Sequence, residues 1–292
     1  MTISGTTLDH VAHAVPRWQE VWTRYAVDLG AEWNSGGPGP GFAPGQLRFG
    51  NDARVEVLMP YDTEVNDFLQ RFIAKSGPGP HHLTFKVPDL SSALDEARRA
   101  GLSPIGIDFS DPEWMEAFIH PKQATGVVVQ LAEAPGGWTS PAPDDYPTER
   151  RQRSDGRGPV DPATLRKVVH AVADLDTATA LFVELLGGEV SGEFTGDRAR
   201  WIDVTWPGPL ALRLISPVGP DPSNEIRWWL GDRPGRIHHL EVAAEEPERL
   251  EGARPIADSW GLPGSTDDGP VRNGWFIAPE DNLGLGLIAY EP

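Results

Sequence analysis

The sequence contains no cysteine, few basic residues and no long hydrophobic run. The lack of cysteine excludes disulfides, thiolate metal sites and a cysteine nucleophile. Lysine and arginine total 25 against 43 acidic residues, a net charge of −18. A chain this acidic repels a phosphate backbone, so we expect no nucleic-acid partner. Because no run of about 18 apolar residues occurs, we also predict no membrane-spanning helix.

The N-terminus lacks the basic stretch followed by an apolar stretch that is typical of a signal peptide, so we expect a cytoplasmic protein. What is present fits a globular chain: 39% of the residues are hydrophobic and 23% are charged. The length of 292 residues allows two domains of ordinary size.

The two halves of the sequence resemble each other at a constant spacing. Leu8–Val15 resembles Leu165–Val172, an offset of 165 − 8 = 157. His81–Leu83 matches His238–Leu240 at 238 − 81 = 157, and a third match follows at 158. Matches in one register predict two homologous domains. We place them at residues 1–135 and 163–292, with 136–162 as a linker rich in proline, glycine and charge.

Each half also repeats internally. His10 and His82 open equivalent segments, 82 − 10 = 72 residues apart. In both segments a strand pattern precedes a helical pattern, at Trp18–Leu29 and Leu90–Ala100, and further strand patterns follow. The unit is β-α-β-β-β and occurs about four times. We therefore predict an α+β fold in which four such modules form two β-cups.

Four polar residues in these strands suggest a metal site. His10 and His82 are equivalent positions of two modules, and the last strands of those modules carry Glu56 and Gln130 among apolar residues. A polar side chain in such a strand needs a partner or a cavity if it is buried. If a pseudo-twofold axis relates the modules, the four side chains can converge. Two imidazoles and two oxygens suit one divalent ion, of Fe, Mn, Co, Ni or Zn.

The other strand histidines have a different expected role. His13 and His170 lie out of phase with His10 and its counterpart in the second half, so we predict that they are structural. His81 and His238 precede another histidine directly, and strict alternation points them to the opposite face. We predict structural or rim positions for these two as well.

The sequence resembles the vicinal oxygen chelate superfamily of glyoxalases and extradiol dioxygenases, whose paired β-α-β-β-β modules form a metal-holding cup. Over roughly residues 6–133 it is most similar to methylmalonyl-CoA epimerase, through Pro80–Val87, Ala93–Gly101 and Phe118–Lys122. The resemblance implies that His10, Glu56, His82 and Gln130 are metal ligands. The second half resembles the superfamily more loosely.

The sequence departs from this family at several points. Gln130 stands where a glutamate is usual, and residues 35–45 contain no carboxylate where the family has its catalytic glutamate. We therefore expect weak activity as a methylmalonyl-CoA epimerase. In the second half Lys167, Arg213 and Ile288 replace three of the ligands. Because cationic side chains cannot coordinate a cation, we predict that this half is metal-free, with Lys167 and Arg213 either binding an anion or forming salt bridges.

The resemblance implies a metal-dependent enzyme of the glyoxalase or epimerase type. Such an enzyme polarises a small carbonyl or carboxylate substrate, CoA thioesters among the candidates, and stabilises an enolate-like intermediate as an isomerase or lyase. His120 is our candidate base, and Lys122, with Lys167 and Arg213, is a candidate for anion binding. Besides the substrate we expect an intramolecular pseudo-dimer, with a homodimer also open.

Two other functions remain open. One is a small-molecule binding or resistance protein, since eleven tryptophans could line an aromatic cavity, although tryptophans are more often core residues. The other is a ring-cleaving dioxygenase, which uses two histidines and a glutamate on iron. The sequence favours it less, because the usual last-strand glutamate is missing at Gln130 and Ile288.

Overall fold

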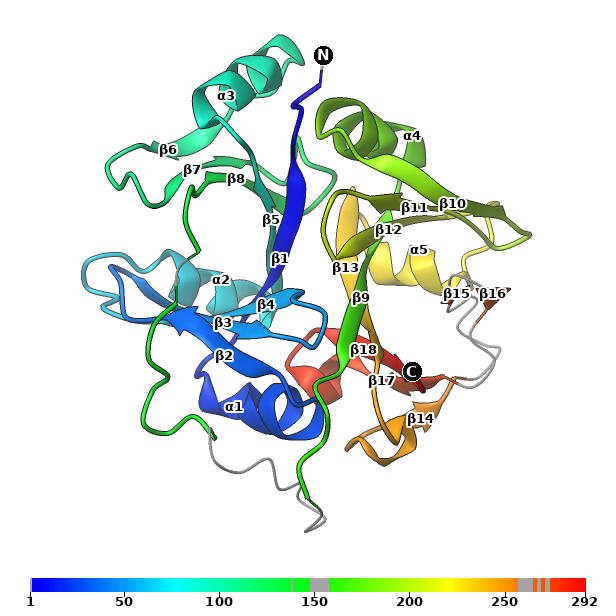
Figure 1. Ribbon diagram of the computed structural model, residues 1–292. Coiled ribbons are helices and arrows are strands. Elements are labelled where there is room, and N and C mark those ends of the chain that lie inside the picture. The colour runs from blue at the N-terminus through cyan, green and yellow to red at the C-terminus, as the bar shows by residue number, and fades with distance from the viewer. Residues whose placement is uncertain (1, 138, 148–157, 257–264, 267–268, 271–273) are drawn as a thin grey trace.

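The structure is a computed structural model that describes residues 2–137, 139–147, 158–256, 265–266, 269–270 and 274–292 (Figure 1). None of the helices in this described part has the length and apolar composition needed to cross a membrane.

The first half forms an eight-stranded sheet of order β2-β3-β4-β1-β5-β8-β7-β6. Its strands are β1 (Thr7–Ala14), β2 (Glu32–Gly36), β3 (Phe42–Arg48), β4 (Arg54–Pro60), β5 (Gly79–Lys86), β6 (Ile105–Asp108), β7 (Met115–Ile119) and β8 (Val128–Glu133). Its helices are α1 (Gln19–Trp22), the π-helix η1 (Thr23–Asp28), α2 (Phe68–Ser76) and α3 (Leu90–Arg99).

The second half repeats this sheet in the order β10-β11-β12-β9-β13-β18-β17-β14. Its strands are β9 (Thr164–Val172), β10 (Glu189–Thr195), β11 (Ala199–Thr205), β12 (Ala211–Pro217), β13 (Gly235–Ala243), β14 (Arg254–Pro255), β17 (Trp275–Ile277) and β18 (Gly286–Tyr290). A separate hairpin contains β15 (Ser265–Thr266) and β16 (Gly269–Pro270). The helices are α4 (Leu175–Thr179), the π-helix η2 (Ala180–Leu185), α5 (Glu225–Leu230) and the 3-10 helices η3 (Pro247–Arg249) and η5 (Pro279–Asn282).

The predicted α+β fold of four modules in two sheets is confirmed. Each sheet joins two modules through their first strands, β1 with β5 and β9 with β13. The repeat extends to helix geometry, because the two π-helices begin 180 − 23 = 157 residues apart. The fourth module deviates: the described residues after β13 contain the short η3 in place of an α-helix. Helix α2 is not predicted by the sequence analysis.

Local sequence explains where the helices of the first half begin and end. The carboxylate of Asp89 accepts a hydrogen bond from the backbone of Ser92 and caps α3, whose Leu90 and Leu94 are buried. The helical segment predicted at Trp18–Leu29 is α1 followed by η1, and it stops before Gly30, whose φ of +65° favours glycine. The buried apolar side chains of both helical segments belong to the hydrophobic core of the molecule.

The described start of the linker packs on the first half. Tyr146 donates a hydrogen bond to the backbone of Ala31 and lies edge-on to Trp22. Ser140 bonds the backbone of Gly36. The boundaries at 135 and 163 remain a prediction, although β8 ends at Glu133 and β9 begins at Thr164.

The halves lie side by side (Figure 1) and share one hydrophobic core that contains residues from Ile3 to Ala289. Their contact is itself pseudo-symmetric. Nε2 of His13 lies 2.9 Å from the carbonyl oxygen of Leu283, and Nε2 of His170 lies 2.9 Å from that of Thr125. Both histidines are fully buried, as their predicted structural role requires. The chain thus forms a pseudo-dimer within one molecule.

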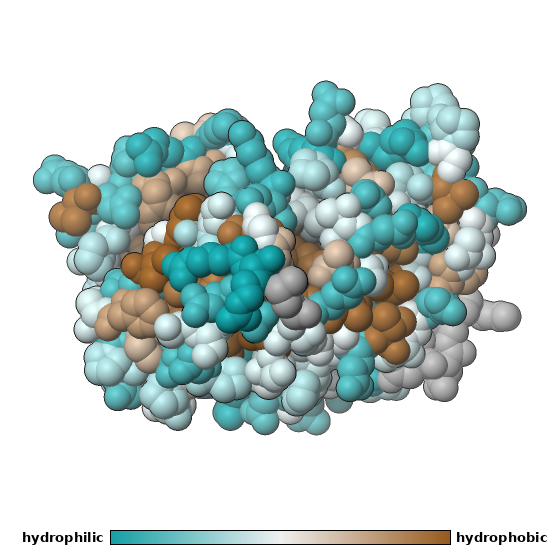
Figure 2. Space-filling view, turned by 90° about the horizontal axis from the view of Figure 1, so that it is seen from above, coloured by the Kyte–Doolittle hydropathy of each residue, from teal (hydrophilic) through white to brown (hydrophobic). Residues whose placement is uncertain are grey.

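On the face of the molecule that Figure 2 shows, hydrophobic patches are interspersed with hydrophilic residues.

We predict that a methyl group at the contact between the halves destabilises the protein. A Cβ added to Gly235 would lie 1.9 Å from the carbonyl oxygen of Thr125, a backbone atom that cannot move freely. Gly235→Ala should lower the free energy of unfolding by about 1–3 kcal/mol. Gly137→Ala is the control, since no atom of the described residues lies within 4 Å of its added Cβ. Urea unfolding measures both, and equal stabilities would contradict this packing.

Candidate metal centre

The candidate ligands lie on the four central strands of the first sheet. His10 is on β1, Glu56 on β4, His82 on β5 and Gln130 on β8. All four are buried, with at most 8% of each residue exposed. Because β4, β1, β5 and β8 are neighbours in the sheet, four residues from distant parts of the sequence meet on one face.

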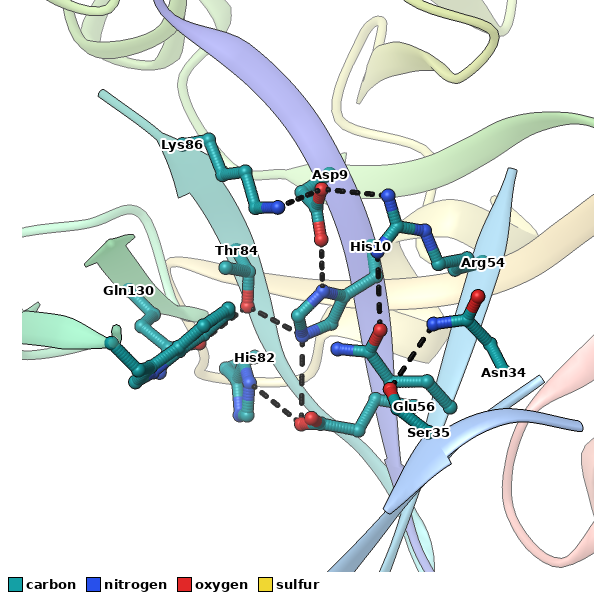
Figure 3. Close-up of polar contacts among 12 residues, drawn as sticks. Asp9, His10, Asn34, Ser35, Arg54, Glu56, His82, Thr84, Lys86 and Gln130 are labelled. Carbon is teal, nitrogen blue, oxygen red and sulfur yellow. Dashed lines mark hydrogen bonds and ion pairs between the residues drawn. The ribbon is translucent and has the colours of Figure 1, made fainter. Parts of the chain in front are cut away.

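Three of these side chains form a compact cluster (Figure 3). Oε2 of Glu56 lies 3.5 Å from Nε2 of His10 and 3.5 Å from Nε2 of His82. One potential ligand atom from each residue lies within 4.8 Å of the others. Nε2 of His82 is buried and has no hydrogen-bond partner among the described residues. Two imidazoles and a carboxylate, with one buried ring nitrogen that makes no hydrogen bond in the described part of the chain, fit a divalent cation better than a purely structural role.

Gln130 joins the cluster through a residue that the sequence analysis missed. The hydroxyl of Thr84 donates to Oε1 of Gln130, and its oxygen is 2.8 Å from Nε2 of His10. On the other side, Nε2 of Gln130 donates to Oε2 of Glu116 at 2.6 Å, and Nε1 of Trp114 donates to the same oxygen at 2.8 Å. The carboxylate of Glu116, on β7, therefore orients the amide group so that its oxygen faces Thr84, which also contacts His10.

Two β-bulges place a second polar residue beside each histidine. Between Leu8 and His10 strand β1 contains one residue more than β5, so Asp9 lies next to His10 and its Oδ2 is 2.7 Å from Nδ1. A second register shift in β5 brings Nδ1 of His81 to 2.9 Å from Nδ1 of His82. The prediction that His81 points away from His82 is therefore wrong, because a bulge suspends strict alternation.

Neighbouring charges shift the pKa values of the ionisable side chains in this cluster. Burial alone would lower the pKa of His10, but the carboxylates of Glu56 and Asp9 outweigh it and raise the pKa to about 9. Burial opposes ionisation of Asp9, yet His10, Arg54 and Lys86 hold its pKa at about 2. The pKa of Glu56 is lowered because the two histidines overcome the effect of burial. The cluster therefore contains carboxylates that stay ionised and a site with a strong preference for positive charge.

The candidate base and the candidate anion site are elsewhere. His120 follows β7 and is exposed, and its Nδ1 accepts a hydrogen bond from the backbone of Lys122. Lys122 is exposed too. No polar contact described for the cluster involves either residue. Besides Asp9, the carboxylate of Glu116 reaches the cluster, through Gln130. Its signal in the sequence is a polar residue two positions before the family-like Phe118.

The second sheet places a built-in ion network at the equivalent position. Nζ of Lys167 donates to Asp203 at 2.8 Å, and Nε and Nη2 of Arg213 both donate to Asp203 at 2.7 Å. Nη1 of Arg213 lies 3.3 Å from Glu241. All four residues are at most 7% exposed. Of the two roles predicted for Lys167 and Arg213, the structure has them in salt bridges.

The partners of these cations could have been found from the repeat. Asp203 is equivalent to Gln46, since 203 − 46 = 157, and Glu241 to Thr84, since 241 − 84 = 157. Gln46 is likewise buried and polar, and it accepts a hydrogen bond from Arg54 at 3.2 Å. Polar residues that recur at equivalent strand positions therefore indicate, from the sequence alone, which residues pair with these cations.

Comparison with known proteins shows the family of this chain. The family model described as a glyoxalase-like domain matches residues 8–186, which is 179 of the 292 residues. The chain belongs to the glyoxalase-like family. The match extends through the first sheet and the linker into the first module of the second sheet.

Several of the proteins to which this chain is similar are epimerases. Mitochondrial methylmalonyl-CoA epimerase of Mus musculus is 31% identical over 137 residues, which are 44% of this chain and 72% of that protein. The ethylmalonyl-CoA/methylmalonyl-CoA epimerase of Cereibacter sphaeroides is 28% identical over 43% of this chain and 96% of its own. The solved methylmalonyl-CoA epimerase of Mycobacterium tuberculosis is 27% identical, covering 44% of this chain and 89% of that one, with a TM-score of 0.40.

We predict that His82→Ala removes most of the metal from the purified glyoxalase-like protein without unfolding it. The reason is that His82 offers one of the three candidate ligand atoms, and its buried Nε2 makes no hydrogen bond within the described residues. Elemental analysis of the folded variant measures the metal. His239→Ala is the matched control, because His239 is equivalent in the repeat but lies in the second sheet. Equal metal in both variants would rule out the assignment.

We further predict that Arg213→Met destabilises the protein by about 3–5 kcal/mol, because it leaves the buried carboxylates of Asp203 and Glu241 undercompensated. Metal content per folded chain should not change. Arg200→Met on the neighbouring strand β11 is the control. Its exposed ion pair with Asp176 should contribute under about 1 kcal/mol. Urea titrations of both variants test this, and a neutral Arg213→Met would refute the proposed ion network.

Proposed function

We propose that the first sheet holds one divalent metal ion and catalyses proton transfer next to a carbonyl or carboxylate group, as an isomerase or lyase. The observation that carries this proposal is the buried cluster of His10, Glu56 and His82, with ligand atoms within 4.8 Å of one another. Gln130 is the fourth ligand we propose, through Oε1. A bound divalent ion would supply Lewis acidity, which polarises a substrate oxygen.

The chain's own residues would provide the remaining chemistry. Glu56 is the one anionic group among the proposed ligands, so the loaded site would keep a positive charge that suits an enolate-like intermediate. Asp9 and Glu116 hold His10 and Gln130 in orientation through hydrogen bonds. Oε2 of Glu116 already accepts two hydrogen bonds. We assign proton transfer to its Oε1, for which the described residues show no bond, rather than to the exposed His120.

Similarity to epimerases of acyl-CoA thioesters supports a small acyl substrate, and a CoA thioester is one candidate. Residues 35–45 contain no carboxylate, so a second base on the opposite side of the substrate is missing from that segment. A reaction that needs proton transfer on a single face fits this arrangement better than epimerisation, which needs it on both.

The proposal predicts metal-dependent exchange of an acidic C–H in D2O. The metal-loaded protein should incorporate deuterium into at least one member of a panel of 2-oxo acids, 3-oxo acids and acyl-CoA thioesters, followed by proton NMR. Methylmalonyl-CoA should exchange well below the roughly 10 s⁻¹ of an average enzyme. The metal-free protein should be inactive.

Glu116→Gln is the matched variant for the proton-transfer step. Its amide oxygen can still accept from Gln130 and Trp114, so metal content should be retained while exchange falls by about 10²–10⁴-fold. Absence of metal-dependent exchange across the whole panel would refute the proposed reaction, and rapid epimerisation of methylmalonyl-CoA would refute its expected weakness.

The cluster of His10, Glu56 and His82 also favours a second candidate function. Two histidines and one carboxylate are the ligand set of non-haem iron oxygenases, including ring-cleaving dioxygenases. Oxygen uptake with catechols by the protein reconstituted with Fe(II) would distinguish this candidate. Tight binding of a small molecule without turnover would instead favour a binding or resistance protein.

A further inference from the structure

Paired histidines occur at the same place in both sheets. Nδ1 of His81 lies 2.9 Å from Nδ1 of His82, and Nδ1 of His238 lies 2.6 Å from Nδ1 of His239. A register shift in β5 and another in β13 bring the two rings of each pair together. In both pairs Nε2 of the second ring is buried without a hydrogen-bond partner among the described residues. The two pairs thus have a similar arrangement. In the first sheet Nε2 of His82 also lies 3.5 Å from the carboxylate of Glu56, whereas Arg213 occupies the strand position of Glu56 in the second sheet.

A hydrogen bond between two ring nitrogens contains a single proton, so one ring donates and the other accepts. If Nε2 of His82 is to offer its lone pair to a cation, the proton of this neutral ring must be on Nδ1. His82 is then the donor and Nδ1 of His81 the acceptor. The proton of His81 must in turn be on Nε2. The contact between the two rings therefore selects the tautomer of both.

We propose that His81 is the positioning residue that prepares His82 to bind the metal ion, by accepting the Nδ1 proton of His82 and fixing its ring. This inference rests on the proposed metal site. His81 is itself held by α2, because the ring of Phe72 lies edge-on at 4.8 Å and that of Phe68 at 6.1 Å. A partner that orients a metal-bound histidine in this way commonly contributes 10- to 100-fold in metal affinity.

The test is the affinity for Zn²⁺ alone, measured by competition with a chromogenic chelator. His81→Phe keeps an aromatic ring between Phe68 and Phe72 but cannot accept the hydrogen bond, so its affinity should fall by about 10- to 100-fold. His81→Gln has a side-chain oxygen that can accept, and it should retain most of the affinity. His238→Phe is the internal control, because it breaks the same bond in the second sheet and should leave the affinity unchanged.

A spectroscopic measurement separates positioning from a merely structural role. In the Zn²⁺-loaded protein, nitrogen-15 NMR of the imidazoles should show the proton of His82 on Nδ1 and that of His81 on Nε2. His81→Phe with an affinity within about threefold of the unaltered protein would overturn the inference, as would the opposite tautomers.

These outcomes are distinct from failure of the proposed reaction. A protein that binds Zn²⁺ and passes both tests, yet exchanges no substrate proton, supports the role of His81 and refutes the proposed reaction. A protein that binds no Zn²⁺ overturns both the role of His81 and the proposed metal-dependent reaction.

Discussion

A buried carboxylate must have positive charge beside it, and both cups of this protein are organised by that constraint. Removing an ionised carboxylate from water costs several kcal/mol unless a cation and hydrogen bonds compensate it. In the first cup Glu56 is compensated by His10, whose pKa is raised to about 9, and His82 lies at the same distance. In the second cup Asp203 and Glu241 are compensated by Lys167 and Arg213.

The two cups have the same backbone fold but compensate their buried carboxylates with different side chains. The first uses ring nitrogens and oxygens, which can exchange a proton for a metal ion. The second uses the cationic side chains of Lys167 and Arg213, which are part of the chain and form ion pairs with the buried carboxylates. Arg213 even occupies the strand position of Glu56, so one change of residue type reverses the sign of charge at the floor of the cup. Duplication allows one copy to retain a candidate site while the other supports the pseudo-dimer through β9, His170 and the shared core.

Irregular strand geometry, rather than regular alternation, builds the surroundings of the candidate ligands. The bulge at Asp9 and the register shift at His81 each place a polar residue beside a ring nitrogen that faces away from Glu56. A regular strand would send these side chains to the opposite face, into the shared core. The irregularities thus allow neighbouring residues in the sequence to serve as a ligand and its orienting partner.

The sequence by itself determined the repeat, the α+β modules and four candidate ligands, because repeats and lone polar residues in apolar strands are local patterns. It also led to the prediction that the second cup holds no metal, since the cationic side chains of Lys167 and Arg213 cannot coordinate a cation. Only the tertiary structure decided which residues contact the candidate ligands and the cations of the second cup. Thr84, Glu116 and Asp203 reach their contacts across neighbouring strands, and the register shift at His81 depends on how β5 pairs with β1. Such contacts depend on strand register, which a single sequence does not contain.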